Sequence, residues 1–264
     1  MARRGDRAVL GADLSVHRFR GRDGAELAYR ETGRGRPLVL IHGYFSTATV
    51  NWVRFGHAAT LAARGHRVVM PDLRGHGDSA APHEASAYPP DALADDGFAL
   101  LEHLELTDYD LGGYSLGART TIRMLVRGAT PGRAVVAGMG LDGIVDANAS
   151  IAYFRRVLAN PGTFERGSPE WMAEAFLQTV GGDPVALLLV LDTSVDTLRE
   201  ALAHIDTPTL VAVGADDEAR RSAEALATAL PNGRFVELPG NHMSAVTKPD
   251  LGVAIADFLD RTDT

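Results

Sequence analysis

Five residues near the middle of the chain, Gly113-Tyr114-Ser115-Leu116-Gly117, place a serine between two glycines. The run follows a short apolar stretch and precedes a segment with helical spacing, which is the context of the G-x-S-x-G nucleophile elbow. In such an elbow a sharp turn lifts the serine hydroxyl clear of the backbone, and side chains at the two glycine positions would collide. The pattern predicts that Ser115 is a nucleophile.

A serine hydroxyl is a poor nucleophile at neutral pH, so an imidazole has to accept its proton during attack. The chain has nine histidines, and we predict that His242 is the base. It follows the last apolar run, Phe235–Leu238, at the end where a parallel sheet delivers side chains to a site. A carboxylate on the other ring nitrogen would fix the tautomer and stabilise the imidazolium.

The elements that must position these groups are visible as continuous apolar runs, which are typical of parallel strands buried on both faces. Segments with helical spacing separate them, and this alternation predicts a parallel sheet with helices on both faces. The expected strands lie at 36–41, 66–70, 109–112, 134–139, 209–214 and 235–238, and the clearest expected helices at 92–104, 116–126 and 222–230.

Motifs in this order resemble the α/β-hydrolase superfamily: His42-Gly43, the Arg74–Ser79 loop, the Ser115 elbow, and an acid followed by His242. The resemblance covers nearly everything from Ser15 to Leu259. It implies an α/β fold with a mostly parallel central sheet flanked by helices on both faces. It also implies one domain over residues 1–264, with a helical cap inserted after the sixth strand at residues 142–206.

The resemblance also implies roles for residues around the nucleophile. The family's usual G-x-x-D spacing from Gly214 selects Asp217 as the acid, with Asp216 and Asp142 as alternatives. The backbone amides of Leu116 and Tyr44 are the expected oxyanion hole. In this family the histidine of the His-Gly motif orients the oxyanion loop, so His42 is expected to be structural, as is His76.

Substrate contacts are expected from Phe45, Tyr114, Met243 and Trp171. Phe45 stands where many family members with short loops have proline. The predicted cap carries an apolar stripe that favours packing for any single residue, but together its members predict an apolar acyl or aryl pocket. The stripe comprises Ile151, Tyr153, Phe154, Trp171, Met172, Phe176, Leu177 and Leu187–Leu191.

Composition excludes several classes of function. A formal net charge of -8 argues against nucleic acid or an anionic membrane as partner, and the absence of cysteine excludes disulfide and thiol chemistry. We find no apolar stretch long enough for a transmembrane helix and no signal-peptide pattern, so a cytoplasmic protein is expected. No metal or nucleotide motif is present, so we expect no cofactor and a small-molecule substrate, and we predict no oligomeric state.

Three functions fit these residues. The first is hydrolysis of a carboxylic ester through an acyl-enzyme on Ser115. The second keeps the triad but cleaves a carbon–carbon bond, or performs the cofactor-free perhydrolysis of haloperoxidases. Carbon–carbon hydrolases often carry an aromatic residue after the catalytic histidine, where this chain has Met243. The third is a ligand receptor built on the same fold.

Overall fold

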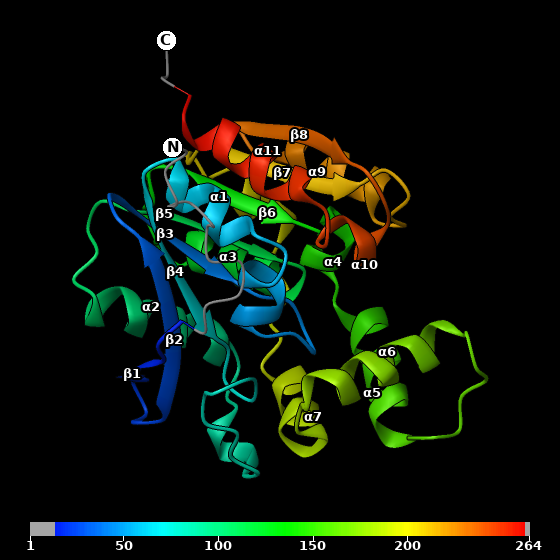
Figure 1. Ribbon diagram of the computed structural model, residues 1–264. Coiled ribbons are helices and arrows are strands. Elements are labelled where there is room, and N and C mark those ends of the chain that lie inside the picture. The colour runs from blue at the N-terminus through cyan, green and yellow to red at the C-terminus, as the bar shows by residue number, and fades with distance from the viewer. Residues whose placement is uncertain (1–13, 262–264) are drawn as a thin grey trace, which may run out of the picture.

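The computed structural model describes residues 14–261, so the basic N-terminal residues 1–7 lie outside the described part. Within it the chain forms an eight-stranded sheet with the order β1-β2-β4-β3-β5-β6-β7-β8 (Figure 1). The strands are β1 (His17–Arg20), β2 (Glu26–Gly33), β3 (Arg36–Ile41), β4 (His66–Asp72), β5 (Asp110–Tyr114), β6 (Ala134–Ala137), β7 (Thr209–Gly214) and β8 (Gly233–Leu238).

Strands β4, β3, β5, β6, β7 and β8 pair in parallel, and their carboxyl ends meet at one edge of the sheet. Strands β5, β6 and β7 are buried along their whole length, which explains their continuous apolar sequences. The predicted fold class is confirmed. The hairpin of β1 and β2, which pairs antiparallel with β4, was not expected, because its polar and apolar residues are mixed as in a half-exposed strand.

Helices cover both faces of the sheet. On one face α1 and α11 pack Leu61 and Ile255 against Leu38 and Val68, while on the other α3 and α9 pack Ile122 and Leu226 against β6 and β7. The helices outside the interval between β6 and β7 are α1 (His57–Ala63), α2 (Ala92–His103), α3 (Leu116–Val126), α9 (Arg220–Ala229), α10 (His242–Ala245) and α11 (Pro249–Leu259), with short turns η1 (Thr49–Val53) and η2 (Ala85–Ala87).

The interval between β6 and β7 contains α4 (Leu141–Val145), α5 (Asn148–Ala159), α6 (Pro169–Val180), α7 (Pro184–Asp192) and α8 (Arg199–Leu202). Side chains of α4 and α8 belong to the core beside the sheet, where Ile144 and Leu202 are buried with Val211. Figure 1 shows α5, α6 and α7 grouped apart from the helices that flank the sheet. The predicted interval 142–206 thus holds these three outer helices, which we call the cap, together with α4 and α8, which pack in the main core. We call the segments that join the cap to the main core, residues 143–147 and 193–197, the outgoing and the returning root of the cap.

Two of the three cap helices begin at a residue whose side chain caps the helix. Ser168 caps α6 and Asp183 caps α7 through side-chain oxygens, and each is followed by a proline at the first helical position. No single helix in the described range is long and apolar enough to cross a membrane. Within residues 14–261, α6 and α7 have that length and composition only when taken together, and they are bent by 115° between them.

Candidate active site

The elbow has the strained geometry that the pattern predicts. Ser115 lies between β5 and α3 with φ 54° and ψ -112°, a conformation that costs a non-glycine residue free energy. A Cβ on Gly117 would come within 2.1 Å of the carbonyl oxygen of Ile41, and one on Gly113 within 2.3 Å of the carbonyl carbon of Gly117. Only glycine therefore fits at either position, and the strain at Ser115 is imposed by the turn.

The structure brings Ser115, His242 and Asp217 together from three separate loops. His242 Nδ1 lies 3.1 Å from Asp217 Oδ2, and His242 Nε2 lies 3.2 Å from Ser115 Oγ. Because a carboxylate only accepts, Nδ1 carries the proton and donates a hydrogen bond to Asp217. This leaves Nε2 free to accept the hydroxyl hydrogen of Ser115, which is the arrangement that nucleophilic attack requires.

The two neighbouring aspartates have different surroundings. Asp217 is buried, and its Oδ1 accepts a hydrogen bond from the N–H of Ala219, whereas Asp216 is exposed. Burial opposes ionisation of Asp217, but the hydrogen bond and charge of His242 and the Ala219 N–H outweigh it and keep the pKa of this carboxyl below its ordinary value. Asp142, on α4, is also exposed. The geometry therefore favours Asp217 as the acid.

The backbone of His242 is held at the start of α10 by two contacts that do not use its ring nitrogens. Asn241 and Ser244 form a capping box around this helix terminus. The hydroxyl of Tyr114 donates to the carbonyl oxygen of His242 at 2.6 Å, and the Tyr114 ring lies 5.4 Å from the imidazole. Tyr114 thus lies behind the histidine as a support.

The two backbone amides predicted to form an oxyanion hole belong to residues near Ser115. Leu116 is the first residue of α3, so its N–H has no acceptor within the helix. Gly43 approaches the nucleophile so closely that an added Cβ would lie 3.3 Å from Ser115 Cβ, and Tyr44 follows it directly. The Tyr44 hydroxyl points elsewhere, because it donates to the carbonyl oxygen of Leu187 on α7 at 2.6 Å.

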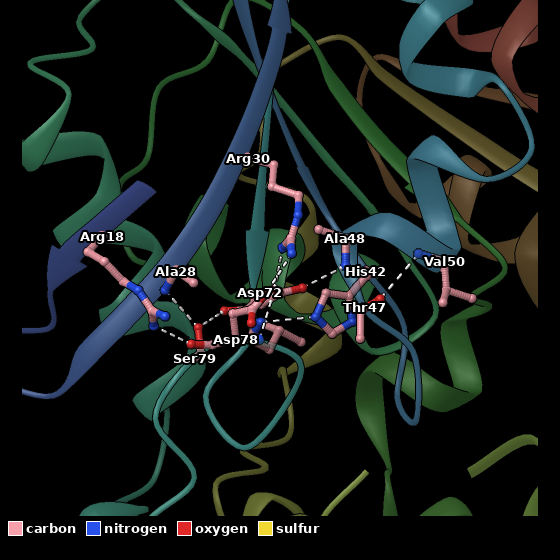
Figure 2. A network of polar contacts seen from close by, with 11 residues as sticks. Arg18, Ala28, Arg30, His42, Thr47, Ala48, Val50, Asp72, Asp78 and Ser79 are labelled. Atoms are coloured by element: carbon pink, nitrogen blue, oxygen red, sulfur yellow. Dashed lines mark hydrogen bonds and ion pairs between the residues drawn. The ribbon is translucent and has the colours of Figure 1, made fainter. Parts of the chain in front are cut away.

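The loop that carries Tyr44 is braced from beneath. His42 donates through Nδ1 to the Gly43 carbonyl oxygen at 2.8 Å and accepts at Nε2 from the N–H of Leu73 at 2.9 Å. Figure 2 shows Asp72 beside it, where the carboxylate accepts from the N–H of Ala48 and from Arg30. Burial lowers the pKa of His42 to about 4, so the ring is neutral near pH 7. This placement agrees with the structural role expected for His42.

A cavity of about 70 Å³ opens beside Ser115 between the main core and the cap. Its apolar lining comes from the oxyanion loop, the segment after β6, α5 and α7: Tyr44, Met139, Ile151, Phe154, Val190 and Leu191. Among the described residues that line it, only Arg119 carries a formal charge. A more open hollow of about 460 Å³ lies between β8 and α11, away from the triad.

The residues predicted to contact substrate lie outside this lining in the described structure. Phe45 is buried and stacked on Tyr44 at 4.4 Å between ring centroids, so it supports the lining from behind. Met243 is 52% exposed, and Trp171 lies on α6 beneath the guanidinium of Arg166. Ile151 and Phe154 belong to the apolar stripe that was expected to form a pocket, and both line the cavity. The direction of each side chain depends on helix packing that periodicity does not specify.

Comparison with known proteins identifies the family of the chain. The model of the alpha/beta hydrolase family matches residues 38–255, which is most of the chain. The chain therefore belongs to the α/β-hydrolase family. Among the described residues, no group of three or more His, Asp or Glu side chains is arranged to hold a metal ion.

Individual relatives differ in the reactions they are named for. A dihydrolipoyllysine-residue acetyltransferase component of the acetoin cleaving system from Pseudomonas putida is 32% identical over 232 residues, covering 77% of this chain but only 60% of that protein. A non-heme haloperoxidase from Rhodococcus erythropolis is 26% identical over 274 residues, covering 90% of this chain and 97% of that protein. The solved structure of a thermophilic esterase from Thermogutta terrifontis superposes with a TM-score of 0.75 at 26% identity, covering 93% of this chain and 98% of that one.

Proposed function

We propose that this protein hydrolyses small, uncharged carboxylic esters through an acyl-enzyme on Ser115. The observation that carries the proposal is the unbroken hydrogen-bonded chain from Ser115 through His242 to Asp217, opening on an apolar cavity. The likeness to a thermophilic esterase over nearly the whole chain supports it.

In this reaction Ser115 Oγ attacks the ester carbonyl carbon while His242 Nε2 takes the hydroxyl proton. The oxyanion that forms would be met by the N–H groups of Leu116 and Tyr44. His242 then gives the proton to the departing alkoxide, which leaves as the alcohol. Water attacks the acyl-enzyme with His242 again as base, and the carboxylic acid and free Ser115 are released.

The size and charge of the cavity indicate the acyl group. At roughly 10–15 Å³ for each water-sized group, about 70 Å³ holds about five to seven such groups, which suits an acyl chain of roughly two to four carbons. Arg119 is already paired with Asp196, so the cavity offers no free cation to a substrate carboxylate. A short, uncharged acyl group is therefore the substrate that this site favours.

The test is hydrolysis of p-nitrophenyl acetate, butyrate and octanoate by the parent protein and by Ser115→Ala. We expect acetate and butyrate to be hydrolysed, octanoate to react at least about tenfold more slowly, and Ser115→Ala to lose at least roughly 10⁴-fold in kcat. Unchanged far-UV circular dichroism is the control for folding. A residual rate within about tenfold of the parent would show that another group is the nucleophile.

A second candidate is perhydrolysis, which the full-length match to the non-heme haloperoxidase favours. In that reaction hydrogen peroxide attacks the acyl-enzyme in place of water, and the acyl group leaves Ser115 as the peracid. His242 accepts the proton of the attacking peroxide, as it does that of water in hydrolysis. Peracid formation from acetate and hydrogen peroxide, measured beside ester hydrolysis, separates the two functions by their rates.

A further inference from the structure

Arg119 is a buried arginine whose position on α3 connects the nucleophile with the cap. It lies four residues after Ser115, one turn along the same helix, and is 5% exposed. Its side chain borders the cavity beside Ser115. A buried guanidinium is costly unless its donors are paired, so the groups that pair with it identify what it holds.

Those partners come from both ends of the cap. Arg119 Nη1 donates to the carbonyl oxygens of Gly143 and Ile144, in the segment that leads from the main core into α5. Arg119 Nη2 donates to the carbonyl oxygen of Val195 at 3.0 Å and to Asp196 Oδ1 at 2.7 Å, in the segment that returns from α7. One planar guanidinium therefore binds the outgoing and the returning root of the cap at once.

Two further hydrogen bonds join the roots directly around this guanidinium. Asp196 Oδ1 also accepts from the N–H of Ala147, across to the outgoing root at 3.0 Å. The N–H of Thr197 donates to the carbonyl oxygen of Ile144 at 3.1 Å. The two segments thus form a hydrogen-bonded junction around Arg119, and Arg119 fixes this junction to α3, the helix that directly follows Ser115.

We propose that Arg119 is a positioning residue that clasps the two cap roots and sets the distance between the cap and Ser115. The two terminal nitrogens of a guanidinium can bond one root each, whereas a lysine ammonium carries its three donors on a single nitrogen and does not span both roots. Ile151, Phe154, Val190 and Leu191 enter the cavity from helices attached to these roots. The clasp therefore fixes the size of the acyl cavity without contact between Arg119 and the reacting atoms.

A different role, binding of a substrate carboxylate, is disfavoured by the same contacts. The charge of Arg119 is already met by Asp196, and both of its terminal nitrogens are bonded to the roots. A substrate anion would have to displace these partners before it could bind.

The clasp is tested first without any enzymatic assay, by hydrogen exchange of the full-length protein. In Arg119→Met we expect amides of residues 148–192 to exchange at least about tenfold faster, since a charge-assisted hydrogen bond contributes about that much to a local opening equilibrium. Asp196→Asn should act in the same direction; its side chain is 48% exposed, so the substitution is tolerable even if Arg119→Met fails to fold. Arg119→Lys should not restore parental exchange, because it cannot hold both roots.

Arg127→Met is the matched control. Arg127 follows the same helix α3 and pairs with Asp95, but it bonds neither cap root. We expect residues 148–192 of this variant to exchange as in the parent. Unchanged cap exchange in both Arg119→Met and Asp196→Asn, equal acceleration in Arg127→Met, or full restoration by Arg119→Lys would overturn the clasp.

The effect on catalysis rests on the proposed esterase function, so it is measured separately. With a loosened cap, the preference for butyrate over octanoate in kcat/KM should fall by about tenfold, and a loss of folded protein alone would not change that ratio. A parent protein that hydrolyses no ester, with cap exchange behaving as expected, would reject the esterase and keep the clasp. Ester hydrolysis with unchanged size preference would reject the proposed control of cavity size.

Discussion

At the scale of single residues, the candidate site depends on backbone turns that decide which side chains reach it. Asp216 and Asp217 have the same side chain, yet the turn after β7 leaves Asp216 exposed and buries Asp217 against His242. The same holds at the nucleophile, where the glycines on either side of Ser115 permit a backbone conformation that serine alone would avoid.

The adjacent aspartates provide a direct test of the triad. Asp217→Asn should lower kcat by roughly 10³- to 10⁴-fold, because the amide can donate to His242 Nδ1 and favour the wrong tautomer. Asp216→Asn should change kcat by less than about tenfold, since its side chain is exposed. Steady-state kinetics with a short aryl ester measures both variants. If the Asp216 variant lost activity instead, the assignment of the acid would be wrong by one position.

The sequence places Ser115, His242 and Asp217 just after strand ends, and the structure joins them in one hydrogen-bonded chain, while their catalytic roles stay a prediction. It predicts the lining of the cavity only in part. The apolar stripe of the expected cap does supply Phe154 and Val190, whereas Arg119 was not expected there. The side chains that were expected but lie outside the lining are Phe45, Tyr114, Met243 and Trp171. Lining depends on the rotation and placement of short helices, which are fixed by packing between segments far apart in the chain.

At the scale of elements, the oxyanion loop and cap helix α7 are linked through one side chain. Tyr44 supplies a candidate oxyanion amide from its backbone, while its hydroxyl bonds Leu187 on α7. Strands β5, β6 and β7 could be predicted because both faces are buried, while β1 and β2 were missed because their sequences mix polar with apolar residues. The roots of the cap were missed because short helices carry little periodicity.

Removing the Tyr44 hydroxyl should loosen this link while keeping the ring. In Tyr44→Phe the Leu187 carbonyl loses its donor, so we expect a loss of about 1–2 kcal/mol in unfolding free energy. We also expect kcat for a short ester to fall by about three- to thirtyfold, since a displaced loop misplaces the oxyanion donor. Denaturant unfolding and steady-state kinetics measure the two effects. Parental kcat together with reduced stability would show that the link serves folding alone.

At the scale of the whole molecule, buried histidines make folding sensitive to acid. His42 and His76 are both buried, and the His76 Nε2 has no hydrogen-bond partner among the described residues. Burial lowers the pKa of His42 to about 4, and burial with the nearby His42 lowers the pKa of His76 to about 3, from an ordinary 6.5. The native protein therefore resists protonation at sites that the unfolded chain protonates readily.

The sign of the effect follows from these depressed values. Between pH 6.5 and about 4 the unfolded chain binds more protons at these two histidines than the native protein. The free energy of unfolding therefore decreases as the pH is lowered, by about 1.4 kcal/mol per pH unit for each histidine. In His76→Phe the slope between pH 6.5 and 4.5 should drop by about that amount. Urea unfolding at several pH values measures it, and equal slopes in the variant and the parent would contradict the assignment.

The junction at Arg119 also separates the part of the sequence that supplies the triad residues from the part that supplies much of the cavity wall. Ser115, Asp217 and His242 all lie outside residues 148–192, while much of the cavity wall lies inside them. Under the proposed function, bond cleavage and substrate choice would therefore be encoded in different stretches of sequence that meet at this junction. We then expect that divergence within the cap changes the accepted ester while Ser115, Asp217 and His242 stay intact, and that a cap transplanted between its roots carries its own preference with it.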